Sequence, residues 1–83
     1  MQRLGWFELP QGFIKREPKI ARKIMGECII VRAEARYDRK VIEYIALSDK
    51  FDETPVGILT PKYIIKITGL KKGVRIDWTK ENT

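Results

Sequence analysis

Apolar and polar residues alternate along several segments of this chain. In residues 27–37 and 74–79, apolar side chains recur at every second position and charged side chains occupy most positions between them. A period of two is typical of antiparallel strands that have one face in the core and one in solvent. Residues 41–48 are apolar on both faces, which favours a central strand. We therefore predict a four-stranded antiparallel β-meander over about residues 27–37, 41–48, 62–69 and 74–79.

The N-terminal third of the chain has a different pattern. Residues 4–9 form a short apolar segment that predicts an edge strand, and residues 10–12 contain the turn formers that end it. Residues 18–25 predict a helix, because Pro18 is tolerated at a first helical position and Gly26 suits a left-handed residue after the last turn. This two-turn helix is too short to be stable alone, so we expect its apolar stripe to pack on the sheet. The sequence predicts one α+β domain over residues 1–83.

The turn between the first two strands of the meander is ambiguous. A two-residue turn at residues 38–39 would place Glu34 opposite Glu43, which is an unfavourable pair of like charges. A four-residue loop at residues 38–41 would instead pair Arg36 with Glu43. We favour the longer loop because it brings opposite charges together.

Composition narrows the chemistry that this chain can perform. The 83 residues contain no histidine and a single cysteine, Cys28. A metal site of the common zinc, haem or iron–sulfur types lacks ligands, and the usual proton carrier near neutral pH is missing. No phosphate-binding glycine loop or nucleophile elbow occurs. We therefore expect no enzyme activity, no catalytic residue, no cofactor and no metal.

The charge balance suggests an anionic partner. Lysine and arginine number 17 against 11 aspartate and glutamate, a formal net charge of +6. In a meander, alternate connections lie at the same end of the sheet, so the turns near residues 38–40 and 71–73 would be neighbours. Cations would gather there, with Tyr37 as the one aromatic ring close to them. This predicted cluster consists of Arg36, Tyr37, Arg39, Lys40, Lys71, Lys72 and Arg75.

A second group of cations accompanies the predicted helix. Five basic residues occur within nine positions and only Glu17 opposes them. Cations early in a helix oppose the macrodipole, a placement that is easier to understand if an anion binds there. The group consists of Lys15, Arg16, Lys19, Arg22 and Lys23.

Together these features predict a small non-catalytic binding protein that acts through a basic surface. The expected partner is nucleic acid or a nucleic-acid-binding site, contacted through phosphate, because the rings other than Tyr37 fall on apolar, core-facing positions. An acidic protein surface is the alternative, with the chain as a phage or mobile-element inhibitor or adaptor. A small ribonuclease toxin without histidine is a remote third hypothesis. We expect a cytoplasmic protein without membrane attachment, which can form homo-oligomers through an edge strand such as residues 74–79.

Overall fold

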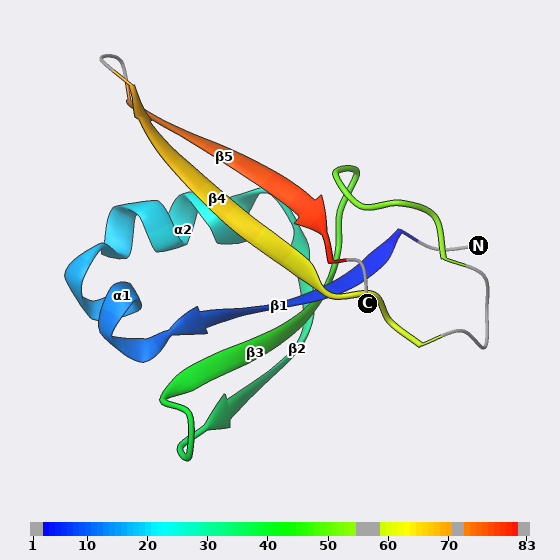
Figure 1. Ribbon diagram of the computed structural model, residues 1–83, viewed down its shortest axis with the longest axis horizontal. Helices are drawn as coiled ribbons and strands as arrows, with labels where there is room; N and C mark the ends of the chain where they lie inside the picture. Colours follow the sequence, from blue (N-terminus) through cyan, green and yellow to red (C-terminus); the bar gives the residue numbers. More distant parts are fainter. Residues whose placement is uncertain (1–2, 55–58, 71–72, 82–83) are drawn as a thin grey trace.

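The chain folds into two separate antiparallel sheets and two short helices (Figure 1). The computed structural model describes residues 3–54, 59–70 and 73–81. A three-stranded sheet has the strand order β1-β3-β2, and a two-stranded hairpin joins β4 to β5. The α+β class and the antiparallel pairing are thus confirmed. The elements are β1 (Leu4–Pro10), α1 (Gln11–Arg16), α2 (Pro18–Gly26), β2 (Ile29–Arg36), β3 (Val41–Leu47), β4 (Tyr63–Leu70) and β5 (Gly73–Lys80).

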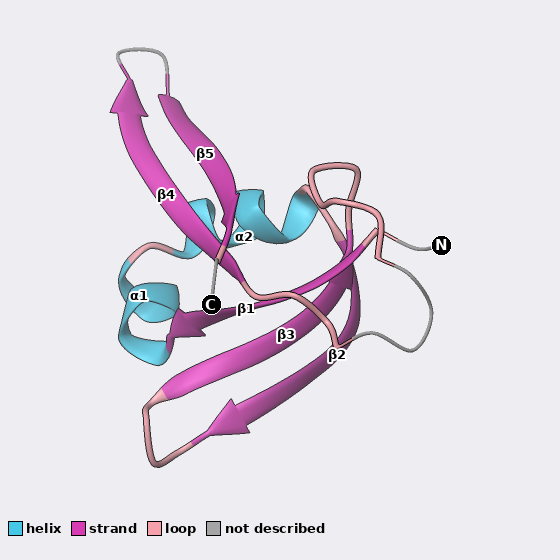
Figure 2. Ribbon diagram, turned by 45° about the vertical axis from the view of Figure 1, so that its right-hand side comes forward, coloured by secondary structure: helices cyan, strands magenta, loops and turns pink. Residues whose placement is uncertain are grey.

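The predicted four-stranded meander is wrong. β1 pairs with β3 along its whole length, from Leu4 opposite Leu47 to Pro10 opposite Val41. The N-terminal edge strand therefore occupies the side of β3 that the meander assigns to β4. The chain after β3 leaves this sheet, and β4 pairs with β5 instead (Figure 2). The prediction that residues 41–48 form a central strand is nevertheless confirmed, because β3 lies between β1 and β2.

Helix α2 agrees with the predicted range, whereas the sequence pattern does not predict α1. α1 begins directly after Pro10, where the sequence indicates a turn, and its side chains Phe13 and Ile14 pack against the core. At the end of α2, Gly26 is a helical residue and has no positive φ. Instead, the backbone N–H of Glu27 donates to the carbonyls at the end of the helix and closes it. The helix therefore needs no left-handed glycine.

A continuous chain of aromatic rings connects the two sheets. The Phe7 ring stacks on Tyr44 at 5.2 Å between centroids, and Trp78 from β5 meets Phe7 edge-on at 5.0 Å. Phe51 contacts Trp78 at 5.2 Å and stacks on Tyr63 at 4.3 Å. All of these residues except Trp78 are 7% exposed or less. One hydrophobic core therefore serves both sheets.

The hairpin β2–β3 adopts the register that the charge argument disfavours. Glu34 lies opposite Glu43 and Arg36 lies opposite Val41. The turn spans residues 37–40, and Lys40 takes a positive φ of 55°. The predicted Arg36–Glu43 strand pairing is therefore wrong, although the two side chains still meet diagonally. A bulge between Ile30 and Arg32 interrupts the N-terminal part of β2.

Candidate functional site

The two helices carry an exposed group of cations that we call the basic helix surface. The opposite, apolar face of α2 explains why these cations are exposed. Ala21 and Ile24 on that face are buried, so the polar positions between them must face outward. Lys19, Arg22 and Lys23 accordingly lie on the solvent side of α2. All five cations of the complete surface are exposed: Lys15, Arg16, Lys19, Arg22 and Lys23.

The basic helix surface has no carboxylate partner within the described part of the chain. None of its five cations forms an ion pair there, and Glu17, although close in sequence, bonds to none of them. Lys23 makes one contact, in which its Nζ donates to the backbone carbonyl of Val74 on β5. The positive charge of this surface is therefore not neutralised by neighbouring side chains.

The helix macrodipole gives less support to an anion site than the sequence suggests. Lys15 and Arg16 lie in the last turn of α1 and Lys23 lies in the last turn of α2, where the dipole favours cations. Only Lys19 stands in a first turn without compensating acids. The unpaired charge, and not the dipole, is what distinguishes this surface.

The cations at the β2–β3 turn have a different environment, because a row of glutamates crosses the sheet beside them. Glu8, Glu43 and Glu34 occupy neighbouring positions on β1, β3 and β2. Arg36 Nε donates to Glu43 Oε1 at 2.6 Å, and Arg39 donates to the other oxygen of Glu43 at 2.9 Å. Arg39 also contacts Glu8 at 3.3 Å. These two arginines thus separate three carboxylates that would otherwise repel one another.

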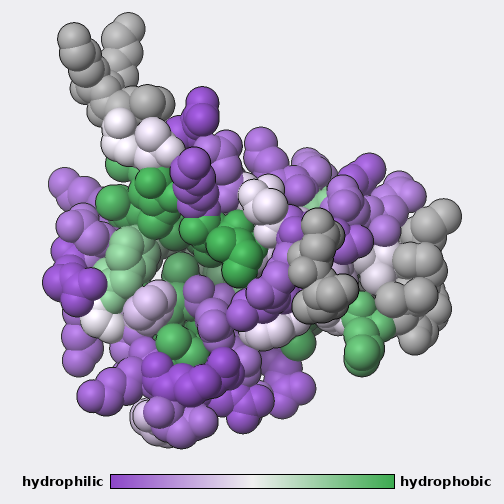
Figure 3. All heavy atoms as spheres, viewed as in Figure 1, coloured by the Kyte–Doolittle hydropathy of each residue, from purple (hydrophilic) through white to green (hydrophobic). Residues whose placement is uncertain are grey.

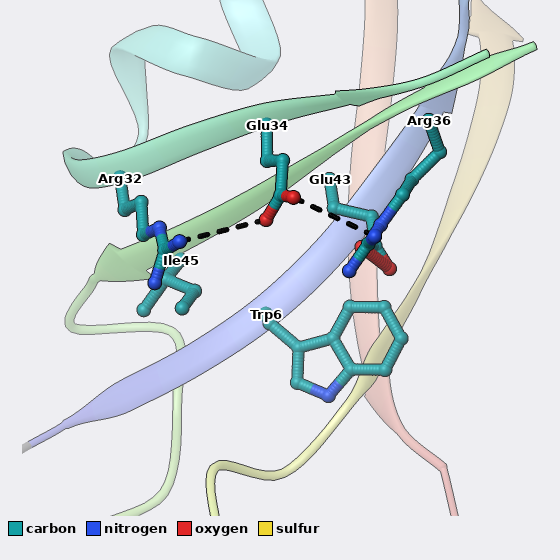
Figure 4. Close-up of a pocket in the computed structure, with 6 residues that line it drawn as sticks. All are labelled: Trp6, Arg32, Glu34, Arg36, Glu43 and Ile45. Atoms are coloured by element: carbon teal, nitrogen blue, oxygen red, sulfur yellow. Dashed lines mark hydrogen bonds and ion pairs between the residues drawn. The ribbon is translucent and has the colours of Figure 1, made fainter.

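The pKa values of these groups reflect the pairing. The hydrogen bond to Glu43, followed by the charge of Glu34, raises the pKa of Arg36 above its usual value. The hydrogen bond from Arg36 lowers the pKa of Glu43, and the bond from Arg39 adds to this effect. Figure 4 shows the Glu34–Arg36 pair beside the indole of Trp6, in a shallow hollow of about 300 Å³. Arg36 and Arg39 therefore stabilise this face of the sheet and have little free charge for a partner.

The described members of the predicted cation cluster at the two turns are not brought together. In both views the β2–β3 turn lies at the bottom of the molecule, whereas β4 and β5 extend towards its top (Figures 1 and 2). Arg75 lies on this hairpin and pairs with Asp77 at 3.1 Å. Lys71 and Lys72 lie outside the described residues. Lys40 and Tyr37 are exposed at the β2–β3 turn, and Tyr37 is 82% accessible.

Sequence reasoning did not find two features of the surface. The first is the glutamate row, which the two-residue-turn register would have revealed through its Glu34–Glu43 pair. The second is an apolar groove of about 430 Å³ between α1 and β4, to which Phe13, Ile65 and Ile67 contribute and which Arg16 borders. Apolar side chains are visible beside the hairpin in Figure 3. This groove depends on how the two sheets meet, which no local pattern encodes.

The aromatic positions mostly match the prediction. Phe7, Tyr44 and Tyr63 are buried, and Trp78 packs among them. Trp6 differs, because β1 directs it to the outer face of the sheet, where the Lys62 ammonium lies 5.0 Å from its ring centroid. No ring of the described residues other than Tyr37 is freely exposed for a base to stack on.

Neither a metal site nor a membrane-spanning helix is found in the described part of the chain. Across residues 3–54, 59–70 and 73–81, no three His, Cys, Asp or Glu side chains gather in a way that could hold a metal ion. No helix in these ranges is long and apolar enough to cross a membrane. Comparison of the chain with protein-family models, with curated proteins and with solved structures found no match.

Proposed function

We propose that this chain is a small cytoplasmic, non-catalytic protein that binds nucleic-acid phosphate through its basic helix surface. The observation that carries the proposal is the contrast between two groups of cations. Arg36 and Arg39 are bound by Glu43 and Glu8. The cations of α1 and α2 have no such partners among the described residues. A partner that supplies anions would neutralise the cations of α1 and α2.

A polyanion with regularly spaced charges suits this surface better than a single small anion. Lys19, Arg22 and Lys23 recur at helical spacing along one side of α2, so successive cations can contact successive phosphates. Each phosphate that is neutralised releases condensed counterions, which is the main source of sequence-independent affinity. The lack of rings beside these cations favours contact with the backbone of the nucleic acid over reading of its bases.

The salt dependence of binding tests this proposal. For four or five phosphate contacts, the slope of log K against log salt should be roughly −3 to −5 on duplex DNA. Replacing Lys19 or Arg22 by Glu should weaken binding on all sequences and reduce the slope by about 1 per lost contact. Lys50→Glu is the matched control, because Lys50 is also an exposed cation but lies outside the basic helix surface. Affinity for DNA and RNA can be measured by fluorescence anisotropy from about 50 mM salt upward.

Two results would contradict the proposal. One is no binding to single-stranded or duplex DNA or RNA at about 50 mM salt. The other is an equal loss of affinity in Lys50→Glu and Arg22→Glu, since net charge alone would then explain the binding. Incubation with labelled RNA in the same series would reveal cleavage, and cleavage would favour the ribonuclease alternative.

The alternative function, inhibition or bridging of a host protein, has its own supporting observation. The apolar groove between α1 and β4 combines partly exposed isoleucines with the positive charge of Arg16. An acidic segment with apolar side chains would match this combination. A bound host protein that is lost in Ile67→Glu but kept in Arg22→Glu would favour this alternative over nucleic acid.

A further inference from the structure

Strand β2 is an edge of the three-stranded sheet, and its outer side is open. All of its residues except Ile30 are exposed, including the large apolar side chains Ile29 and Val31. No described strand or loop pairs with this edge. An open edge of this kind is a template for an additional strand.

The backbone groups that this edge presents can be identified from the alternation of hydrogen bonds. In an antiparallel strand, successive residues direct their N–H and C=O groups to opposite sides. The N–H of Trp6 bonds outside the sheet to Pro61 O at 2.9 Å, so Ile45 opposite it directs its groups towards β2. Glu43, two residues away, does the same and lies opposite Glu34. It follows that Ala33 and Ala35 direct their N–H and C=O away from β3.

The other strand edges are less suitable for pairing. The β1 edge is occupied by the segment at Pro61 and Lys62. On β5, the predicted oligomerisation strand, Lys23 of α2 already binds the Val74 carbonyl, and the Trp78 indole donates to Glu27. β4 carries a lysine but no acidic residue, so pairing of β4 with β4 of a second copy would give that lysine no carboxylate partner. β2 is therefore the edge that best fits an additional strand.

We infer that β2 pairs with β2 of a second copy of this chain, antiparallel and centred on Ala33. In this register Arg32 of each copy lies opposite Glu34 of the other, so opposite charges meet twice across the two-fold axis. Centring on Glu34 instead would set Glu34 against itself and Arg32 against Arg36, which repel. The Arg32 side chain is 69% exposed and only loosely held by its own Glu34 at 3.6 Å. The self-pairing would join two three-stranded sheets into one of six strands.

The small side chain at the centre allows the two backbones to approach. Ala33 of each copy would exchange two hydrogen bonds with Ala33 of the other, because both direct their polar groups outward. Pairing would also cover apolar surface along β2 that is now in solvent, beginning with Val31. In this register the bulge beside Val31 limits the regular pairing to residues 32–34 of each copy, because residues 35 and 36 lie opposite the bulge of the other copy.

The oligomeric state in solution tests this inference. Sedimentation over a concentration series should show a transition from 9.7 kDa to twice that mass. Ala33→Pro should raise the dissociation constant at least about tenfold, since it removes the two central hydrogen bonds but no bond within one copy. Glu34→Arg should weaken the dimer through like charges, and the exchange of both residues, Arg32→Glu with Glu34→Arg, should restore it. This exchange keeps the test valid if Ala33→Pro does not fold.

A cysteine pair tests the register. In a Cys28→Ser background, Ala33→Cys should form an intermolecular disulfide, because hydrogen-bonded strand partners lie about 5.5 Å apart between Cα atoms. Ala35→Cys is the matched control on the same face and strand. Its two copies would be about 13 Å apart in this register, since four residues separate them along the strand. Cross-linking of Ala35→Cys in preference to Ala33→Cys, or a protein that stays at 9.7 kDa throughout, would overturn the inference.

Discussion

Gly5 lies where the two sheets meet, and its replacement by alanine tests the packing of the core. A Cβ atom at this position would lie 2.6 Å and 2.8 Å from two ring carbons of Tyr63 and 2.9 Å from a ring carbon of Phe51. Carbon atoms pack well at about 3.5–4.0 Å, so each of these contacts is too short by close to 1 Å. The Tyr63 ring cannot move freely, because it stacks on Phe51 and its hydroxyl accepts the N–H of Asp52 at 2.7 Å.

The expected loss of stability in Gly5→Ala follows from two opposing contributions to the free energy of unfolding. Overpacking of a core costs about 1–3 kcal/mol. Replacing glycine by alanine inside a strand ordinarily gains about 0.5–1 kcal/mol. We therefore expect Gly5→Ala to lose about 1–2 kcal/mol of the roughly 4–12 kcal/mol that stabilises a domain of this size. The melting temperature should fall by about 4–16 °C.

Thermal unfolding followed by circular dichroism measures this effect, and the chain supplies its own control. Gly69 lies on β4, where an added Cβ atom would meet no heavy atom within 4 Å, so Gly69→Ala should leave the melting temperature unchanged or slightly higher. In a Tyr63→Leu background the cost of Gly5→Ala should shrink, because the clashing ring is gone. An unchanged melting temperature for Gly5→Ala, or an undiminished cost beside Tyr63→Leu, would refute the close-packing argument.

Two further predictions concern titratable groups. Because Arg36 and Arg39 hold the pKa of Glu43 below its ordinary 4.5, this pairing stabilises the fold above about pH 4.5 and is lost as pH falls through the lowered pKa. Urea unfolding between pH 6 and pH 3 should therefore show a smaller loss of stability in Glu43→Gln than in the native chain, and equal losses would contradict the pairing. Burial, with a smaller contribution from Glu27, raises the pKa of the Cys28 thiol from 9.0 to about 11, so at pH 8 the folded protein should react about 100-fold more slowly with iodoacetamide than the urea-unfolded chain. Equal rates in both states would show that the thiol is not shielded.

The sequence predicts the five strands and α2, because their signals are local, but it does not predict α1. The period of two in β2 and β5 and the apolar stripe of α2 are properties of single elements. In β2 the period predicts the strand but not a core-facing side, because Ile29 and Val31 are exposed. Sheet composition is decided by contacts between distant residues, such as Phe7 on β1 with Tyr44 on β3. Two apolar strands can pair in several ways, and alternation alone does not choose among them. This is why alternation predicts a meander where the sheet β1-β3-β2 forms.

The candidate site likewise has some features that local sequence predicts and others that depend on contacts between distant residues. The exposure of Lys19 and Arg22 follows from helical spacing within a single element, and both side chains are exposed in the structure. The pairing of Arg39 with Glu8 joins residues 31 positions apart and needs the β1–β3 register. The rule that two like charges disfavour a strand pairing also fails for the glutamates of β2 and β3. It ignores the arginines that separate their carboxylates. Whether a cation is free for a partner is therefore a property of the tertiary structure.

The strand order has a consequence for how the protein is made. β1 leaves the ribosome before β2 and β3, but its partner β3 begins 31 residues after β1 ends, at Val41 opposite Pro10. At about 5–20 residues per second, this interval lasts roughly 2–6 s. During that time the apolar side of β1, with Phe7 and Leu9, has no sheet to join. The hairpin β2–β3 can close as soon as it is complete, so the nascent chain acquires its central hairpin before its first strand finds a place beside it.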